Sequence, residues 1–282
     1  MSTLPLETAV RQQFEVDHIE GEEMVARCKW HADTGRPNLY VNGTTGLYYC
    51  FVCGARGKVD GALSASDHIS ALRRRLQALG SPVEPVDGIK PEGWLRQFTA
   101  GHSYWSTARG FNEATINSWQ LGYDPNTNRL TIPIRTAHGQ LLGAIYRALD
   151  DGKPKYLHPR GFRTGQHLFG AHLVGDRKRV ALVEGPLDAI ACWHARVPAL
   201  AVYGARLTEG QVDLLHYLGV RVLVPMFDRD RPGTEAEMRV LEIGPGNGFI
   251  VRTGEWPSPT AKDPAELRSS QRRSFWLSAG GV

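Results

Sequence analysis

Residues 179–230 read RVALVEGPLDAIACWHARVPALAVYGARLTEGQVDLLHYLGVRVLVPMFDRD, and this stretch decides the fold of the larger part of the chain. Short apolar runs rich in β-branched residues alternate here with longer amphipathic runs, and the alternation continues to residue 251. The expected strands span 179–184, 199–203, 220–227 and 248–251, and the expected helices span 186–196, 208–218 and 232–243. Such alternation is typical of an α/β layer with a mostly parallel sheet. Cys192, within an apolar helical pattern, is expected to be a buried core thiol.

Acidic residues follow the first and third expected strands: Glu184, Asp188, Asp228 and Asp230. Because function gathers at the carboxyl ends of parallel strands, we expect these four side chains to share one crevice. Clustered carboxylates repel one another and favour a divalent cation, and their hard oxygen ligands suit Mg²⁺ or Mn²⁺. A single acid of this kind would fit a helix cap or a surface charge equally well. The group of four indicates a metal site suited to phosphoryl or nucleotidyl transfer.

A second set of metal-ligand residues lies near the N-terminus: Cys28, His31, Cys50 and Cys53. Two residues separate the members of each pair, and eighteen residues separate the pairs. A two-residue gap lets a tight turn present both side chains to one tetrahedral ion, so the pattern predicts a structural Zn²⁺ site without an open position. Strands are expected over 39–41 and 47–50, between the pairs. A disulfide is the alternative, but nothing else indicates an oxidising compartment.

Charge and hydropathy indicate where the protein is located and what it binds. The 282-residue chain has a net charge of +4, no run of eighteen apolar residues and no apolar signal core at its N-terminus. We therefore expect a cytoplasmic protein that does not contact membranes. Basic residues outnumber acidic ones between residues 90 and 179, and aromatic residues are interleaved with them. Such a segment favours nucleic-acid binding, although a solvated surface over an aromatic core has the same composition.

Composition also suggests a division of the chain. An amphipathic helix is expected over 67–80, and the residues after it are rich in proline and lack periodicity. The expected parts are a zinc-ribbon DNA-binding domain (1–80), a linker (81–91), a basic subdomain (92–175), an α/β catalytic subdomain (176–270) and a C-terminal tail (271–282). For the tail, capping of its own domain is favoured over docking on a partner.

Several motifs resemble those of one family. EGPLDA (184–189) and FDRDRPG (227–233) are similar to the two acidic motifs of the Toprim fold, which primases, topoisomerases and some nucleases share. YCFVCGARG (49–57), with the zinc pattern, resembles the zinc domain of bacterial and phage primases. Three further motifs follow the primase order: the Arg-Gly helix and Gly-Tyr turn of 109–125, the strand pair of 129–147, and PKYL with LFG in 154–170. The chain thus resembles DnaG-type DNA primases over roughly residues 4–270.

This resemblance implies synthesis of short RNA primers from ribonucleoside triphosphates on a single-stranded DNA template. It implies a catalytic acidic set of Glu184, Asp188, Asp228, Asp230 and Asp263, of which Glu184, Asp228 and Asp230 bind magnesium. It also implies nucleic-acid or nucleotide contacts from Arg109, Arg135, Arg147, Lys155, Tyr156 and Arg163. A replicative helicase is a candidate partner, although the family's helicase-binding domain has no counterpart. The compact build suggests a phage or mobile element in a bacterial cell.

The chain departs from the family pattern at three places. The third acidic motif is Asp263-Pro-Ala-Glu266, with Ala265 in place of an aspartate; Ile145-Tyr146 replaces a Gly-Gly pair; and Thr164 stands where a lysine is expected. Two other functions remain open. A non-catalytic zinc/Toprim recombination mediator that clamps DNA would not need the Arg-Gly and Pro-Lys-Tyr motifs. A Toprim nuclease is the second alternative, whereas a topoisomerase would need a nucleophilic tyrosine in a large separate domain.

Overall fold

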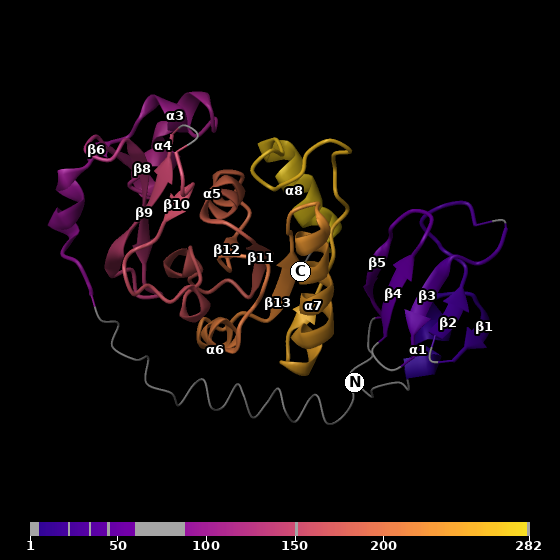
Figure 1. The fold of residues 1–282 in the computed structure, drawn as a ribbon. Coiled ribbons are helices and arrows are strands. Elements are labelled where there is room, and N and C mark those ends of the chain that lie inside the picture. Colours follow the sequence, from indigo (N-terminus) through magenta and orange to yellow (C-terminus); the bar gives the residue numbers. More distant parts are fainter. Residues whose placement is uncertain are drawn as a thin grey trace.

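The computed structural model describes residues 6–21, 23–33, 35–43, 46–59, 88–149 and 152–280. The helix expected over 67–80 and most of the expected linker lie outside these residues. Within the described part, the strands form three sheets that follow one another along the chain (Figure 1). None of the described helices is long and apolar enough to cross a membrane.

The first sheet is antiparallel, and its five strands pair in chain order. Its elements are α1 (Leu6–Gln13), β1 (Val16–Glu20), β2 (Glu23–Ala26), β3 (Leu39–Asn42), β4 (Leu47–Cys50) and β5 (Arg56–Lys58). Val10 of α1 packs against Leu39 and Val41 of the central strand, and all three side chains are fully buried. This core is small, because it draws on one short helix and one sheet face.

The second sheet is also antiparallel, in the order β10-β9-β8-β7-β6. Its part of the chain contains η1 (Glu92–Gln97), β6 (Thr99–Ala100), α3 (Ser103–Thr107), α4 (Glu113–Ser118), β7 (Gly122–Asp124), β8 (Arg129–Arg135), β9 (Leu141–Ala148), β10 (Tyr156–Leu157), η2 (Thr164–Gln166) and η3 (Ala171–Leu173). The Lys90 N–H donates to the Leu141 carbonyl at 2.7 Å. The end of the expected linker therefore already pairs with this sheet.

The third sheet is parallel, in the order β12-β11-β13-β14. It comprises β11 (Arg179–Val183), α5 (Pro186–His194), β12 (Ala199–Ala201), α6 (Glu209–Tyr217), β13 (Val222–Pro225), α7 (Arg231–Gly246), β14 (Ile250–Val251) and the last helix, α8 (Ser269–Ser278). The predicted fold class is confirmed, and each expected strand and helix of this part is present with somewhat different ends. Cys192 is fully buried, as expected.

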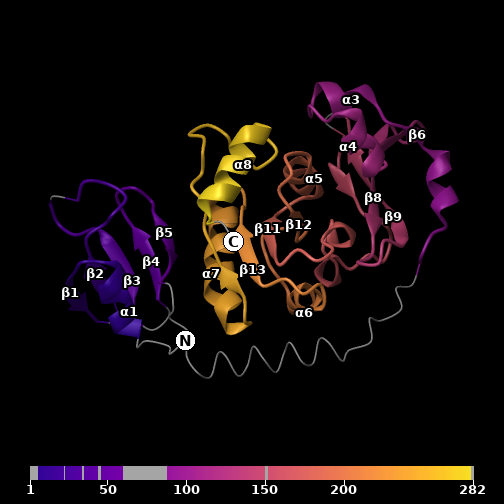
Figure 2. The same ribbon diagram turned by 180° about the vertical axis from the view of Figure 1, so that it is seen from behind.

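Alternation along β11 sets the layers of this α/β unit. Ala181 and Val183 belong to the hydrophobic cluster that contains α5 and Phe275 of α8. Val180 and Leu182 belong to the cluster on the other face, which contains apolar residues of α6 and α7. Successive side chains of a strand point to opposite faces, so a strand apolar on both faces requires helices on both sides. Figures 1 and 2 show the central strands with α5 and α8 toward one end of the view and α6 toward the other.

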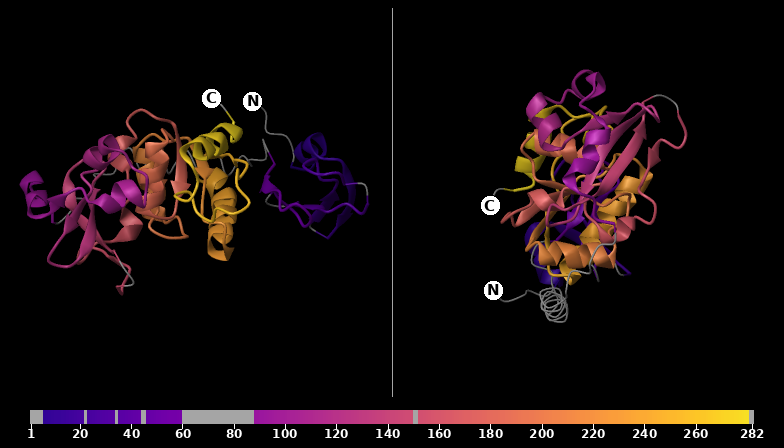
Figure 3. Two further views of the ribbon diagram at one scale, coloured as in Figure 1. Left: turned by 90° about the horizontal axis from the view of Figure 1, so that it is seen from above. Right: turned by 90° about the vertical axis from the view of Figure 1, so that its left-hand side faces the viewer.

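Contacts between their elements join the three sheets. The Phe169 and Ala201 backbones form an antiparallel bridge between the end of the basic segment and β12, and one cluster of buried residues spans both sheets. Arg56 of β5 donates to Glu237 of α7, with 3.1 Å between Nε and Oε2. Both of these side chains are largely buried, at 12% and 15% exposed. The N-terminal sheet therefore lies beside α7, as Figure 3 also shows.

Candidate functional site

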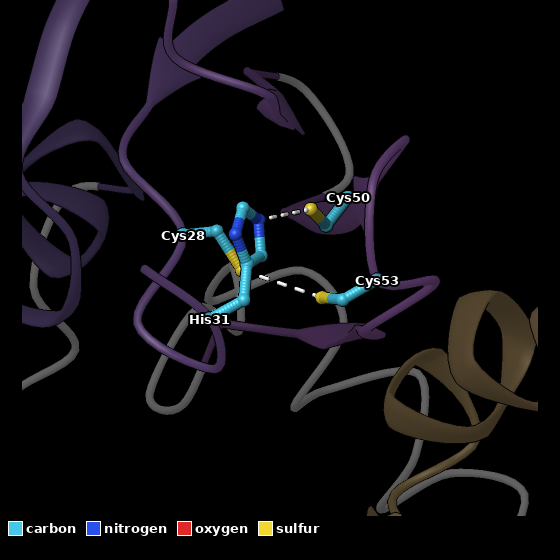
Figure 4. Close-up of side chains that lie close together, drawn as sticks. All are labelled: Cys28, His31, Cys50 and Cys53. Atoms are coloured by element: carbon cyan, nitrogen blue, oxygen red, sulfur yellow. Dashed lines mark hydrogen bonds between the residues drawn. The ribbon is translucent and has the colours of Figure 1, made fainter. Parts of the chain in front are cut away.

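The four predicted metal ligands of the N-terminal sheet converge on one point (Figure 4). All ligand atoms of Cys28, His31, Cys50 and Cys53 lie within 4.8 Å of one another. Cys28 Sγ lies 3.6 Å from Cys53 Sγ, and His31 Nε2 lies 3.3 Å from Cys50 Sγ. Around a tetrahedral zinc ion, two sulfur ligands lie about 3.8 Å apart and a sulfur and a nitrogen about 3.6 Å apart. The donor set and its spacing therefore fit a four-coordinate zinc ion.

Local turns bring these ligands together. The second pair is presented by a turn in which the Gly54 N–H donates to the Cys50 carbonyl at 2.9 Å. Gly54 has a φ of +71°, which favours glycine at this position. At the first pair, the Asp33 carboxylate accepts from the Cys28 N–H at 2.9 Å and closes the turn. Each half of the site thus forms from a few neighbouring residues.

The four cysteines are free thiols, so the disulfide alternative is wrong. The Cys28–Cys53 sulfur separation is far above the ~2.05 Å of a disulfide bond. Burial raises the pKa of Cys28 to about 12. Burial also opposes ionisation of Cys50, but N–H donors from Cys53 and Val52 and the His31 ring outweigh it and lower the pKa to about 7. Of these two thiols, Cys50 is therefore the more readily ionised, and the ionised thiolate is the form that binds a metal.

The predicted acids lie at the carboxyl ends of two neighbouring parallel strands. Glu184 directly follows β11, and Asp228 follows β13, which pairs with β11. The Asp228 N–H donates to Glu184 Oε1 at 3.4 Å, which links the two strand ends. Asp188 lies in the first turn of α5 and is only 9% exposed. These three carboxyl groups therefore share the edge of the sheet where the sequence predicts them.

Asp188 is held by backbone donors on two sides. Its Oδ2 accepts from the Gly185 N–H at 3.2 Å, and its Oδ1 accepts from the Ala265 N–H at 3.2 Å. Ala265 belongs to the third acidic motif, which this contact brings against α5. Within that motif, Asp263 Oδ1 accepts from the Glu266 N–H at 2.7 Å. The segment between β14 and α8 therefore completes the acidic site.

Burial and mutual repulsion raise the pKa values of these carboxyl groups. Burial, with the nearby Asp263 charge, raises the pKa of Asp188 to about 7. Burial, followed by repulsion from Asp188 and Glu184, raises the pKa of Asp228 to about 8. Groups with raised pKa values gathered at one edge favour a cation, which stabilises their ionised forms.

The donor set passes a second test for a divalent cation. The buried Asp228 Oδ1 has no hydrogen-bond partner among the described residues. An unpartnered buried carboxylate oxygen fits a hard cation such as Mg²⁺. Among the described residues, only the zinc ligands lie close enough together to hold a metal ion as they stand, so the acids are less tightly gathered.

Asp230 differs from the other predicted magnesium ligands because its side chain also caps a helix. It is the N-cap of α7, where its Oδ1 accepts from the Gly233 N–H at 2.8 Å. Its charge still acts on Glu184, whose pKa is raised by burial and by Asp230. Asp230 therefore both starts the helix and adds to the negative potential of the site.

Three of the predicted basic residues lie beside two aromatic rings, those of Tyr104 and Tyr156, and the sequence did not single out Tyr104. The Arg109 guanidinium lies 5.5 Å from the Tyr104 ring centre, and its Nε donates to the Tyr104 hydroxyl at 3.0 Å. The Arg147 guanidinium lies 5.0 Å from the same ring and 5.9 Å from the Tyr156 ring. Lys155 Nζ lies 5.8 Å from the Tyr156 ring. We call these five residues the Tyr104 cluster.

The Tyr104 cluster and the acidic site influence each other electrostatically. Burial raises the pKa of Tyr156, while the charges of Arg147 and Arg109 lower it and that of Asp188 raises it. Both tyrosines of the cluster pack against the hydrophobic cluster that contains Leu187 and Ala189, the two chain neighbours of Asp188. Arg147 is 9% exposed and donates to the Ala148 carbonyl at 3.1 Å, so its guanidinium is fixed in place.

Arg135 and Arg163 are not part of this cluster. Arg135 donates to Glu92 at 2.6 Å and to the Gly139 carbonyl at 2.6 Å, which ties it within its own sheet. Arg163 is exposed at the start of η2. The sequence contained Tyr104 only as one of several interleaved aromatic residues, and it placed Arg272, which contacts the acidic loop, in a tail. Neither residue has a local pattern that marks it, because both act through the folded chain.

The chain is similar to known proteins in sequence and in fold. A family model described as Toprim-like matches residues 181–268. The DNA primase of Deinococcus radiodurans is 29% identical over 300 residues, which cover 85% of this chain and 52% of that protein. The DNA primase of Thermotoga maritima is 27% identical over 313 residues, which cover 88% and 54%. The chain thus spans about half the length of the curated relatives it matches.

Solved structures share the fold. The zinc-binding and RNA polymerase domains of the Aquifex aeolicus primase match 98% of this chain and 82% of that one, with a TM-score of 0.53 and 17% identity. A DnaG primase catalytic domain bound to single-stranded DNA matches 74% and 78%, with a TM-score of 0.55 and 19% identity. The resemblance to DnaG-type DNA primases is therefore confirmed: the chain has a primase-like fold and carries a Toprim-like domain.

Proposed function

We propose that this chain synthesises short RNA primers from ribonucleoside triphosphates on single-stranded DNA. The observation that carries the proposal is that two features adjoin the start of α5. They are the carboxyl groups after β11 and β13 and the Tyr104 cluster, whose two tyrosines pack against the apolar cluster that contains Leu187 and Ala189. Nucleotidyl transfer needs carboxylates for metal ions and cations for phosphates. The similarity to primases along 85% of the chain supports the same activity.

Glu184, Asp228 and Asp230 would hold the divalent cations, Mg²⁺ or Mn²⁺, with Asp188 and Asp263 as the other acids of the catalytic set. When bound, such ions stabilise the attacking and leaving oxygens of the transfer. Glu184 and Asp228 come from adjacent strands of the rigid sheet, so their separation is fixed before substrate arrives.

The basic residues would bind the anionic substrates. Arg109, Arg147 and Lys155 offer donors to phosphate oxygens, and Tyr156 fixes the direction of two of these side chains through its ring. Arg163, exposed at the start of η2, would contact template. Arg135 is bonded within its own sheet, so the proposal gives it no contact with nucleotide.

Cys28, His31, Cys50 and Cys53 would hold a structural zinc ion, and the N-terminal sheet would engage the template. A relative solved with single-stranded DNA makes such a template the natural substrate to test. A replicative helicase remains a candidate partner, and a bacterial cytoplasm the candidate location. Binding of a purified replicative helicase would be measured after the activity itself.

Primer synthesis is the direct test. Single-stranded DNA, Mg²⁺ and labelled ribonucleotides are incubated with the parent chain, with Asp228→Asn, and with Asp213→Asn as a matched control at an exposed acid of α6. We expect new oligoribonucleotides with the parent and the control and a strong loss with Asp228→Asn. A DNA clamp would bind DNA in all three without product, and a nuclease would shorten the DNA instead. Either of these results would overturn the proposal.

A further inference from the structure

The last helix, α8, contributes a buried arginine to the edge of the acidic site. Arg272 is 5% exposed, although arginine side chains are almost never fully buried without partners. Its Nε donates to the Pro264 carbonyl at 2.7 Å, and its two terminal nitrogens donate to the Ala191 carbonyl at 3.1 Å and the Ala265 carbonyl at 2.9 Å. The planar guanidinium thus ties α5 and the loop of Pro264 and Ala265 to α8 in a way that a point charge cannot.

One of these bonds continues directly to a predicted catalytic acid. The Pro264 carbonyl and the Ala265 N–H belong to the same peptide unit. Arg272 Nε donates to that carbonyl, and the N–H of the unit donates to Asp188 Oδ1 at 3.2 Å. Each bond of such a chain polarises the next one, so the cation strengthens the donor that Asp188 receives. The peptide plane fixes the direction between Arg272 and Asp188, because a peptide bond does not rotate freely.

The other two hydrogen bonds of Arg272 fix the helix and the loop that surround Asp188. Ala191 lies in α5, the helix that carries Asp188, so Arg272 joins α5 to α8. The Ala265 carbonyl anchors the far side of the Asp263–Glu266 loop. Burial lowers the pKa of Arg272, and the charges of Cys192, Asp188 and Asp263 oppose that effect. The guanidinium is therefore near enough to the acids to offset part of their repulsion.

From this geometry we propose that Arg272 is a positioning residue of the acidic site. By holding the Pro264–Ala265 peptide, it orients Asp188 and the Asp263 loop toward a bound divalent cation. The helix that carries it, which lies beyond the Toprim-like match at 181–268, is accordingly part of the cation site rather than a tail. The inference rests on the proposed function for the identity of that site.

Manganese binding tests the inference without relying on activity. Zinc-loaded protein free of nucleotide is titrated with Mn²⁺, and free Mn²⁺ is followed by electron paramagnetic resonance. Loss of a group that orients metal ligands typically weakens metal affinity about 10–100-fold. We therefore expect Arg272→Gln to weaken Mn²⁺ binding at least about tenfold. Arg272→Lys should weaken it less than Arg272→Gln, because the ammonium keeps the positive charge, although it reaches fewer than three carbonyls.

Two control variants separate positioning from simple loss of stability. Arg273→Gln changes the exposed neighbour on the same helix and should leave Mn²⁺ affinity unchanged. Phe275→Leu trims the buried core of α8, so it should lower the melting temperature while Mn²⁺ affinity stays that of the parent. If Arg272→Gln does not fold, the comparison of Arg272→Lys with Phe275→Leu decides the question.

The outcomes distinguish the inference from the proposed function. Arg272 variants that bind Mn²⁺ like the parent, while Asp228→Asn does not, would overturn the inference alone. Weakened binding in Phe275→Leu equal to that in Arg272→Gln would reduce Arg272 to a structural residue and also overturn it. A parent that binds Mn²⁺ but makes no primers would overturn the proposed function and leave the inference standing.

Discussion

The two candidate metal sites are built in opposite ways. The zinc ligands lie within residues 28–53, on turns that are closed by hydrogen bonds between neighbouring residues. The acids come from residues 184 to 263, and strands and helices that pack only in the folded core bring them together. The zinc-ligand sheet has a small core, so we expect its fold to depend on a zinc ion, whereas a larger core supports the acidic site and is expected to fold without an ion. Loss of the zinc ligands or of zinc should therefore unfold only the N-terminal sheet. Substitution of a catalytic acid should abolish activity and leave the fold intact.

Zinc removal should give the largest effect and is the sharpest test of this contrast. Chelation, or Cys50→Ala, should unfold residues 6–59 and leave residues 88–280 folded, since structural zinc contributes about 10–16 kcal/mol of apparent binding energy to such small domains. Amide NMR spectra with and without chelator would measure this. Cys192→Ala, at a buried thiol of the core, is the control and should leave the N-terminal signals in place. An N-terminal sheet that persists without zinc would break the comparison.

Asp228→Asn should separate chemistry from fold at the acidic site. Primer synthesis should fall about 10²–10³-fold, the range seen when one electrostatic group is removed from an active site. The metal-free melting temperature at pH 8 should stay the same or rise, because the substitution removes a half-buried charge that its neighbours repel. Rates and melting curves on the same samples measure both quantities. A large drop in the melting temperature would mean that the acid supports the core.

The pH dependence of stability should carry the same signature. An acid whose pKa is raised on folding binds more protons in the folded state, so the stability it contributes is lost as pH rises from the unfolded value through the folded one. For Asp188 and Asp228 this window runs from about pH 4 to about pH 8. Zinc-loaded protein without Mg²⁺ should thus melt several degrees lower at pH 8.5 than at pH 5.5.

Magnesium should reverse this loss. Addition of Mg²⁺ should raise the melting temperature more at pH 8.5 than at pH 5.5, because it binds the ionised carboxylates. Differential scanning fluorimetry at the two pH values, with Asp228→Asn as the control, measures the difference. An equal Mg²⁺ effect at both values would contradict the raised pKa values.

The smallest effects are expected among the basic residues. Arg147→Lys should lower primer synthesis about tenfold, because a lysine keeps the charge but loses the planar contact with the Tyr104 and Tyr156 rings. Arg135→Gln should change the rate less than about twofold, since Arg135 is already bonded to Glu92. Initial rates over a range of nucleotide concentrations measure both. Equal effects of the two substitutions on the rate would contradict the proposal that residues of the Tyr104 cluster bind substrate and Arg135 does not.

The sequence predicted most accurately those elements that depend on local residue patterns. Apolar runs in the 179–251 stretch predicted every strand of the parallel sheet, because a strand buried on both faces has few polar options. Thr208 illustrates the same point for helices: its side chain accepts from the Gln211 N–H and starts α6 one residue later. Strand ends were less well predicted, since β13 ends at Pro225 and not at Phe227.

The sequence by itself determined the zinc-ligand set, the order of strands and helices, and the acids that follow β11 and β13. These features depend on the spacing between near neighbours, which can be read directly from the sequence. Only the tertiary structure decided that Arg135 pairs with Glu92, that Tyr104 gathers Arg109 and Arg147, and that Arg272 reaches the peptide that holds Asp188. The physical reason is that these contacts join residues from different elements, and no local pattern encodes which side chains the packing of those elements will bring together.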